Sequence, residues 1–389
     1  MSIRRVALGF LAPVAALAFA LLVSSLALIL IDQAPLDAFK AMLEYGLYDA
    51  EDGLQTDSLI SMANRAAPLY LSGLAVAIGF KMNLFNIGVE GQYRLAALIA
   101  ASVGGAVALP APLHVTLIIV TAMAVGAFWA GIAGVLKVTR GVHEVISTIM
   151  LNFIATGLGA YLLATYLSAE RGAQDLIIGT PEIPPSGRFP SLNRLLTALG
   201  MEEVPADLFG FTLIAVLVGA VFYVLVWRTR FGYDLRASGV NPGASRASGI
   251  DPGGMVIRTM LLSGAIAGLV GLTDILGFSY SFNLDFPAGL GFAGIAVALV
   301  GRNHPVGIGL AAVLFAFIDR SAQILDLEDV PKEIIQIMQG VIILSVVIAY
   351  EVVRRLVEAQ EVKSAAAATR SGDGRRGGGG TAASEVTPA

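Results

Sequence analysis

Uninterrupted apolar segments recur along the whole chain, and they constrain its fold more than any other feature. Hydrophobic residues make up 56% of the 389 positions and charged residues only 14%. A soluble globular chain carries about 25% charged residues, whereas a helix of ~20 apolar residues crosses the hydrocarbon core of a bilayer. The sequence therefore predicts an all-α integral membrane protein.

Apolar segments bounded by charged residues or by Pro and Gly clusters predict about ten transmembrane helices. They cover residues 6–31, 59–80, 92–109, 113–136, 145–167, 210–227, 257–277, 288–301, 306–325 and 334–353. The first segment is too long for a cleaved signal peptide, whose apolar core has about 7–15 residues, so we interpret it as a retained span. An even number of spans, with Lys and Arg concentrated on the cytoplasmic side, places both termini in the cytoplasm.

Polar segments divide the chain into a membrane domain and a tail. Residues 1–358 form the predicted transmembrane domain, in which 32–58 and 168–209 are external and 228–252 is a cytoplasmic region. An amphipathic helix is expected within 32–58. Residues 359–389 are rich in Ala, Gly and Ser and cannot bury an apolar core, which predicts a disordered cytoplasmic tail.

The segment KMNLFNIGVEGQ (81–92) brings polar residues and glycines between two apolar spans. Irregular backbone at membrane depth is tolerated only where it is buried in protein or lines a water-filled cavity. One interpretation is a broken helix that lines a translocation pathway with Asn83, Asn86, Glu90 and Gln92. The other is that Glu90 pairs with Arg94 one turn later and caps the following helix. The residues alone leave both interpretations open.

A second interruption lies in the other half of the chain, at FPAGLGFAGIA (286–296). Pairs of short or Gly/Pro-interrupted segments in corresponding positions of two halves indicate the substrate site of a transporter. The pattern therefore favours two inverted halves, with broken or re-entrant segments near the membrane midplane. A loop followed by an ordinary glycine-rich span is the alternative.

Two further segments carry polar residues next to spans. In residues 228–252, Asn241-Pro242 is typical of a helix start and Gly249 of a helix end. Such a short basic helix either docks on a partner protein or only connects two spans. In HEVISTIMLN (143–152), the Asn152 amide requires partners from a substrate or a neighbouring helix, and His143 and Glu144 favour contacts between helices.

The sequence lacks the residues that several kinds of chemistry require. The chain has no cysteine and no G-x-x-x-x-G-K-[ST] loop for ATP phosphates. Its three histidines lack metal-ligand spacing, and no nucleophile–base pair is visible, so we expect no enzyme activity, metal or cofactor. The net charge of −4 does not indicate a nucleic-acid partner. Carboxylates within the spans are scarce, which weakens the alternative of an ion-coupled secondary transporter of a small polar solute; the main ones are Glu90, Asp274 and Asp319.

Four motifs together resemble a known family. They are NLFNIGVEGQ (83–92), HEVISTIMLN (143–152), GVNPGASRASGI (239–250) and GFAGIAVALVGRNHP (291–305). They are similar to permease subunits of bacterial nucleoside importers of the ABC type, within a wider branch that includes simple-sugar and branched-chain amino-acid permeases. The first two motifs are typical of the nucleoside branch, and the resemblance covers residues 1–355.

The resemblance implies a permease that moves nucleosides, or else sugars or purine-like ligands, across the bacterial inner membrane by alternating access. Its partners would be a second permease in a heterodimer, two cytosolic ABC ATPase subunits, and a substrate-binding lipoprotein or periplasmic protein of the basic-membrane-protein type. Residues 239–250 would form the coupling helix, with Gly239, Asn241, Arg246 and Gly249 docking on the ATPase. The substrate pathway would include Asn83, Asn86, Glu90, Gln92, Asn152 and Phe292, with Glu90 accepting hydrogen bonds from ribose hydroxyls.

Overall fold

The computed structural model describes most of the chain between residues 18 and 327. The described residues are 18–19, 21–49, 53–169, 178–198, 200, 205–327, and single positions at 337, 340, 341, 344, 345, 348, 352 and 355. They belong to two compact units, one formed by Met1–Pro35 with Glu333–Ala389 and the other by Leu36–Lys332. In the first unit residues 21–29 are helical. Half of the predicted span 6–31 and most of 334–353 lie outside the described residues, and the tail 359–389 lies wholly outside them.

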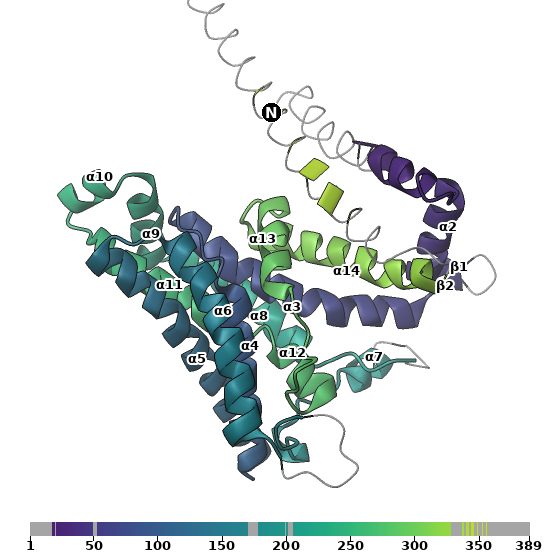
Figure 1. The fold of residues 1–389 in the computed structure, drawn as a ribbon, viewed down its shortest axis with the longest axis horizontal. Coiled ribbons are helices and arrows are strands. Elements are labelled where there is room, and N and C mark those ends of the chain that lie inside the picture. The colour runs from purple at the N-terminus through teal and green to yellow at the C-terminus, as the bar shows by residue number, and fades with distance from the viewer. Residues whose placement is uncertain are drawn as a thin grey trace, which may run out of the picture. The chain divides into compact units, whose positions relative to one another are not determined.

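The second unit is mostly helical (Figure 1). Its elements are α2 (Pro35–Gly46), β1 (Tyr48–Asp49), β2 (Gly53–Leu54), α3 (Thr56–Lys81), α4 (Val89–Ala106), α5 (Ala111–Arg140), α6 (Glu144–Leu162), α7 (Asn193–Ala198), α8 (Phe211–Arg228), α9 (Arg230–Val240), α10 (Pro242–Ala247), α11 (Pro252–Gly268), α12 (Leu272–Asp274), α13 (Leu290–Val300) and α14 (Pro305–Leu327). A π-helical turn, Leu163–Leu167, extends α6, and another, Ile275–Ser279, follows α12. The two short strands form an antiparallel hairpin that pairs Tyr48 with Leu54.

Five helical segments are long and apolar enough to cross a membrane, which confirms the multi-pass, all-α class. They are Ala111–Arg140, Glu144–Leu167, Phe211–Arg228, Pro252–Ser279 and Pro305–Leu325. The predicted span 288–301 is instead the helix α13, which has 11 residues. At 1.5 Å per residue it is only ~16 Å long and does not cross the hydrocarbon as a helix. The count of ten spans therefore stays a prediction.

The helix α3 is the centre of the second unit, and α8, α11, α13 and α14 pack around it. The α13 helix begins against the middle of α3, where the Ser72 hydroxyl donates to the Leu290 carbonyl at 2.8 Å. A Cβ atom on Gly294 would collide with Ser72. Small residues at such a crossing let two backbones approach and gain dispersion contacts, which is what holds helices together in lipid.

The helices α5 and α11 form a second close contact and run antiparallel. A Cβ atom added to Gly264 would overlap the carbonyl oxygen of Gly126, and one on Gly268 would overlap that of Ala122. The glycines at these positions therefore permit direct backbone contact between the two helices. This pair forms a frame beside the central helix α3.

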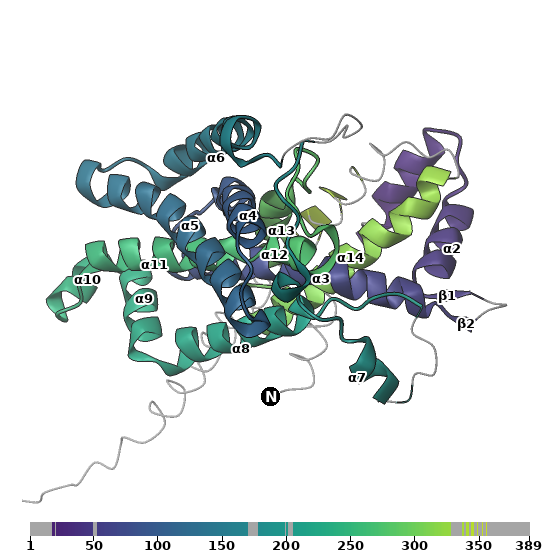
Figure 2. The same ribbon diagram turned by 90° about the horizontal axis from the view of Figure 1, so that it is seen from below.

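The two ends of the bundle differ in charge. The helices α9 and α10 project from one end of α8 and α11, and α7 lies at the opposite end (Figures 1 and 2). Positive residues lie in the last turns of the helices that end near α10, and they include Lys81, Lys137, Arg140 and Arg228. We call this end of the bundle the basic end. The predicted short helix after Asn241 is confirmed as α10. Asn241 caps it by accepting a hydrogen bond from the Ala244 amide at 3.0 Å, and Gly249 follows with φ +82°.

Replacing Gly264 by alanine should destabilise the protein by about 1–3 kcal/mol, because the added methyl group meets the Gly126 backbone and cannot be accommodated by a rotamer change. Thermal unfolding in detergent, followed by tryptophan fluorescence, measures the change. Gly157→Ala is the matched control, since nothing lies within 4 Å of its added Cβ and alanine favours a helix by about 0.5–1 kcal/mol over glycine. Equal melting temperatures for the two variants would contradict the close α5–α11 contact.

Candidate functional site at the junction of two broken segments

The segment between α3 and α4 turns back into the bundle. The Leu84 amide donates to the Gly79 carbonyl at 3.0 Å. Further along, the side-chain Nδ2 atom of Asn86 donates to the Ser263 hydroxyl at 2.8 Å, and that hydroxyl donates to the Ala75 carbonyl at 2.6 Å. The distance along α3 from Lys81 back to Ala75 is ~9 Å. Residues 82–88 are therefore a re-entrant segment, and α4 begins inside the bundle.

A second irregular segment, residues 280–289, approaches from the opposite end. The amides of Thr180 and Ile183 donate to the carbonyls of Phe282 and Tyr280 at 2.9 and 2.8 Å, which anchors its start. The segment ends where α13 begins, beside Ser72. Ser72 lies ~13 Å along α3 from Lys81. The two interruptions predicted at 81–92 and 286–296 therefore meet inside the bundle.

Glu90 connects the two broken segments. Its Oε1 atom accepts a hydrogen bond from the Gly289 amide at 2.8 Å, and its Oε2 atom accepts one from the Gly291 amide at 2.9 Å. The side chain is only 8% exposed. Glu90 thus caps the N-terminus of α13 from the first turn of α4. No described ion pair joins Glu90 to Arg94, so the local pairing considered from the sequence is not formed.

The electrostatic reason for this contact is the direction of the two helices. Both α4 and α13 have their N-termini at the junction, and each N-terminus carries roughly half a positive charge together with unpaired N–H groups. The Glu90 carboxylate lies between them and neutralises both. The Tyr93 hydroxyl completes the junction, at 3.1 Å from Oε1 of Glu90 and 2.7 Å from the Pro287 carbonyl; its single proton is donated to one acceptor at a time.

Asn86 and Gln92 are almost completely buried and bind each other. The Asn86 amide nitrogen donates to Gln92 Oε1 at 3.0 Å, and the Gln92 amide nitrogen donates to Asn86 Oδ1 at 2.9 Å. Asn86 Oδ1 also accepts from the Gly88 amide at 3.0 Å. Their polar groups hold the backbone of the re-entrant segment in place.

Asn152, on α6, has a similar role. Its Oδ1 atom accepts from the Gly91 amide at 2.9 Å, and its Nδ2 atom donates to the Ile87 carbonyl at 2.9 Å. It therefore satisfies backbone groups on both sides of the point at which α4 begins. A Cβ atom on Gly91 would lie 2.9 Å from the Asn152 Cα atom, so the close approach of α4 and α6 depends on this glycine.

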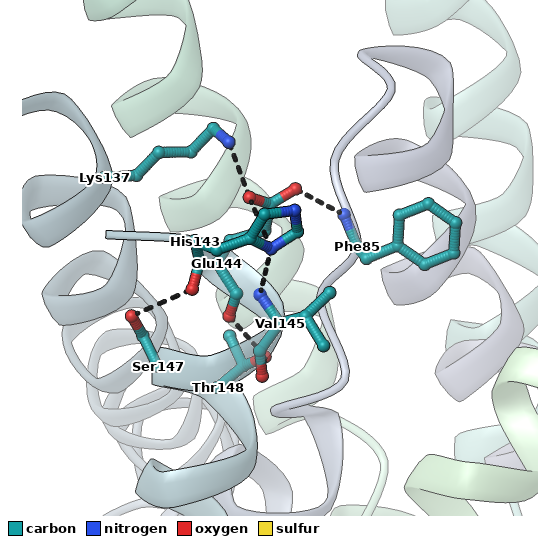
Figure 3. Close-up of polar contacts among 7 residues, drawn as sticks. All are labelled: Phe85, Lys137, His143, Glu144, Val145, Ser147 and Thr148. Carbon is teal, nitrogen blue, oxygen red and sulfur yellow. Dashed lines mark hydrogen bonds and ion pairs between the residues drawn. The ribbon is translucent and has the colours of Figure 1, made fainter. Parts of the chain in front are cut away.

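Glu144 fixes the start of the re-entrant segment at the basic end (Figure 3). Its Oε2 atom accepts from Lys137 Nζ of α5 at 2.5 Å, and its Oε1 atom accepts from the Phe85 amide at 3.4 Å. The Glu144 side chain is only 4% exposed. The adjacent His143 caps α6, because its Nδ1 atom accepts from the Val145 amide at 3.3 Å. One carboxylate therefore joins α5, α6 and residues 82–88.

The residues predicted for the pathway fall into two groups. Asn86, Glu90, Gln92 and Asn152 converge on the junction and are bonded within the protein, whereas Asn83 and Phe292 are exposed. Four residues at these contacts were not among the predicted site residues, namely Tyr93, Lys137, Ser263 and Gly291, although Gly291 lies within the predicted interruption 286–296. The i,i+3 spacing of Glu90 and Tyr93 on one helix gave a signal for the first, and Lys137 is separated from Glu144 by only seven positions. Ser263 and Gly291 contact residues that are remote in the sequence.

The predicted coupling region touches the re-entrant segment directly. A Cβ atom on Gly239 of α9 would lie 2.7 Å from the Cα atom of Met82 and 3.0 Å from the Lys81 carbonyl oxygen. Asn241, Arg246 and Gly249 are exposed around α10. The exposed α10 helix is thus linked, through α9 and Met82, to the segment that leads to Glu90.

Two helices that begin inside an apolar bundle, with facing N-termini, define an all-α membrane transport protein. A family model described as branched-chain amino acid transport system / permease component matches residues 58–347, and the chain belongs to this permease family. It is the transport subunit of an ABC system, in which ATP hydrolysis belongs to partner ATPases. Because the chain belongs to this family, the alternative interpretation as an ion-coupled secondary transporter is not retained.

The named relatives of this chain are also permeases of ABC transporters. A glucose ABC transporter permease of Haloferax volcanii is 34% identical, covering 87% of this chain and 87% of the relative. A guanosine ABC transporter permease of Bacillus subtilis is 36% identical over 73% of this chain and 79% of its own length. A second guanosine permease of the same bacterium is 26% identical over 65% of this chain and 77% of its own length.

Replacing Glu90 should destabilise the protein even without any solute, because Gly289 and Gly291 lose their acceptor. We expect Glu90→Ala to cost about 2 kcal/mol or more, since hydrogen bonds to a charged group contribute ~1.5–3 kcal/mol and the amides stay buried. Glu90→Gln should lose part of the same stabilisation, because the NH₂ group of glutamine faces N–H donors and cannot accept from them. Thermal unfolding of the solute-free protein measures both, with the exposed Glu182→Gln as control. An unchanged melting temperature for Glu90→Ala would contradict the capping role.

Proposed function

We propose that this permease imports nucleosides across the bacterial inner membrane, and that the solute passes the junction of α4 and α13. The observation that carries the proposal is the meeting of two helix N-termini at Glu90 beside an exposed aromatic side chain, Phe292 of α13. The names of the two guanosine permeases support a nucleoside as the solute. The glucose permease makes a sugar the second candidate.

The pathway residues have different tasks in this proposal. Phe292 is 52% exposed and offers a ring on which a nucleobase can stack. Asn83, exposed at the basic end, offers an amide to ribose hydroxyls at the exit. Asn86, Gln92 and Asn152 hold the backbone of the re-entrant segment and the start of α4 in place. Glu90 acts mainly as a positioning residue, because its oxygens already bind two backbone amides.

A second permease is the expected partner for the face that carries Phe292. Large apolar side chains continue this exposed surface onto the end of α13 and onto α14; they are Leu299, Val306, Leu310 and Val313. Two different guanosine permeases from one bacterium are both relatives of this chain, which favours a heterodimer. The solute then moves between the two permeases.

The basic end faces the cytoplasm in this proposal, because positive residues are retained on that side of a membrane protein. Both termini are then cytoplasmic. Two ATPase subunits dock on the coupling helices, here on the exposed residues Asn241, Arg246 and Gly249. A substrate-binding lipoprotein or periplasmic protein delivers the solute to the opposite end. Movement of α10 reaches the junction through the contact of Gly239 with Met82.

Transport should require the whole assembly and should prefer nucleosides. The test is uptake of labelled guanosine into proteoliposomes that contain this chain, the second permease and the ATPases, with the binding protein present. We expect ATP-dependent accumulation that unlabelled nucleosides reduce and glucose does not. Competition by glucose alone would contradict the choice of solute. Uptake by this chain alone, driven by an ion gradient, would contradict the ATP-driven mechanism.

Coupling should depend on the space at Gly239. Gly239→Val places a branched side chain against the Met82 backbone, which displaces the re-entrant segment. We expect the ATPases still to co-purify, while solute-stimulated ATP hydrolysis and uptake fall at least tenfold together. Arg246→Glu on α10 should instead reduce co-purification of the ATPases, because it reverses an exposed charge. Normal stimulation in Gly239→Val would show that the Gly239–Met82 contact does not transmit the movement.

A further inference from the structure

A cluster of aromatic rings and cations lies at the basic end of α8. Tyr223 and Trp227, one turn apart, stack with ring centroids 5.5 Å apart and an interplanar angle of 23°. His304, between α13 and α14, lies 5.3 Å from the Trp227 ring. The Lys81 ammonium group lies 5.0 Å from the centre of the Trp227 ring, and the Arg228 guanidinium lies 6.0 Å from that of Tyr223. Residues from α3, α8 and the α13–α14 turn therefore meet here.

The positive charge of this cluster is not balanced by the described residues. No carboxylate in the described part of the chain forms an ion pair with Lys81 or Arg228. Arg236 of α9 adds a third positive charge that acts on Lys81, and its guanidinium donates to the Val226 carbonyl. By contrast Lys137, at the same end, has Glu144 as its partner. A cation cluster without a carboxylate is suited to an anion.

An apolar stripe leads along α8 to this cluster. Its members are exposed and recur at helical spacing on one face: Leu213, Leu217, Val221 and Val224. Arg228 continues the same spacing and ends the stripe. The Tyr223 and Trp227 rings lie beside it, in the position that aromatic residues favour at the boundary between hydrocarbon and headgroups. The surface thus offers an apolar path that ends in aromatic rings and cations.

We propose that Lys81, Arg228 and the Tyr223–Trp227 pair bind the phosphate headgroup of an anionic phospholipid whose acyl chains lie along α8. The two cations match the phosphate, the aromatic pair matches the interfacial glycerol region, and the stripe matches the acyl chains. A soluble partner such as the ATPase has no need of the apolar stripe, and the exposed helix α10 projects beyond it. This site is separate from the junction at Glu90 and does not depend on the identity of the solute.

The chain provides its own reporter for this site. It contains two tryptophans, Trp129 and Trp227. In a Trp129→Phe background all tryptophan fluorescence comes from Trp227, and brominated acyl chains quench it only on contact. The full-length chain, without its partner subunits, is placed in bilayers that contain either brominated phosphatidylglycerol or brominated phosphatidylcholine. We expect the anionic lipid to quench Trp227 at a lower mole fraction than the zwitterionic lipid.

Removal of the two charges tests the assignment. Each cation near a membrane surface changes the affinity for anionic lipid by roughly fivefold, so Lys81→Gln with Arg228→Gln should abolish the preference for phosphatidylglycerol. Lys81→Arg keeps the charge and should keep the preference. The control pair Lys40→Gln with Arg140→Gln removes the same net charge from exposed sites outside the cluster and should also keep it.

Three results would overturn the proposal. Equal quenching by the two lipids would show that the cluster has no preference for anionic lipid. A preference that survives the double substitution would place its origin elsewhere. A double variant that keeps the lipid preference but loses the ATPases on purification would assign the cluster to protein docking. Melting temperatures measured in the same Trp129→Phe background exclude misfolded variants from the comparison.

Discussion

The arrangement of the bundle depends on the way a buried carboxylate and two helix N-termini satisfy one another. Glu90 alone would be costly in hydrocarbon, by several kcal/mol. Two helices that begin inside the bundle would likewise leave amide groups without partners, which a membrane interior does not tolerate. The bonds from Gly289 and Gly291 to Glu90 solve both problems at once. Neither broken segment is complete without the other, so distant parts of the sequence are held together at this point.

The contacts around the junction differ in stiffness. The α5–α11 and α3–α13 crossings bring backbones together at Gly264 and Gly294, so they resist sliding. Residues 82–88 are held instead by separate hydrogen bonds, the longest of them from the Phe85 amide to Glu144 at 3.4 Å. A displacement applied at Met82 is therefore absorbed by the re-entrant segment before the framework helices move. Such localised change between rigid elements is the usual form of switching in packed proteins.

The sequence predicted the elements whose signals are local. Apolar runs located α5 and α8, and polar residues with glycines located both breaks. It did not predict the partner of Glu90, because helical spacing exposes only neighbours within a turn, such as Arg94, whereas Gly289 and Gly291 become neighbours only in the fold. The bounds of α13 were predicted to within two residues, but its interpretation as a membrane-crossing span was wrong for a related reason. An apolar run crosses a membrane either as one helix or as a short helix preceded by irregular chain, and composition does not distinguish the two.

The distribution of ion pairs separates the roles of the two ends. Among the described residues, the pairs of Lys40, Arg65, Arg188 and Arg320 with carboxylates lie away from α10, whereas Lys137 pairs with Glu144 at the basic end. A cation neutralised by a carboxylate contributes little to long-range attraction. Lys81 and Arg228, which form no ion pair with a described carboxylate, therefore contribute positive charge at that end. This asymmetry is what both the proposed orientation of the chain and the proposed lipid site require, and it depends on where ion-paired carboxylates lie as much as on where lysine and arginine occur.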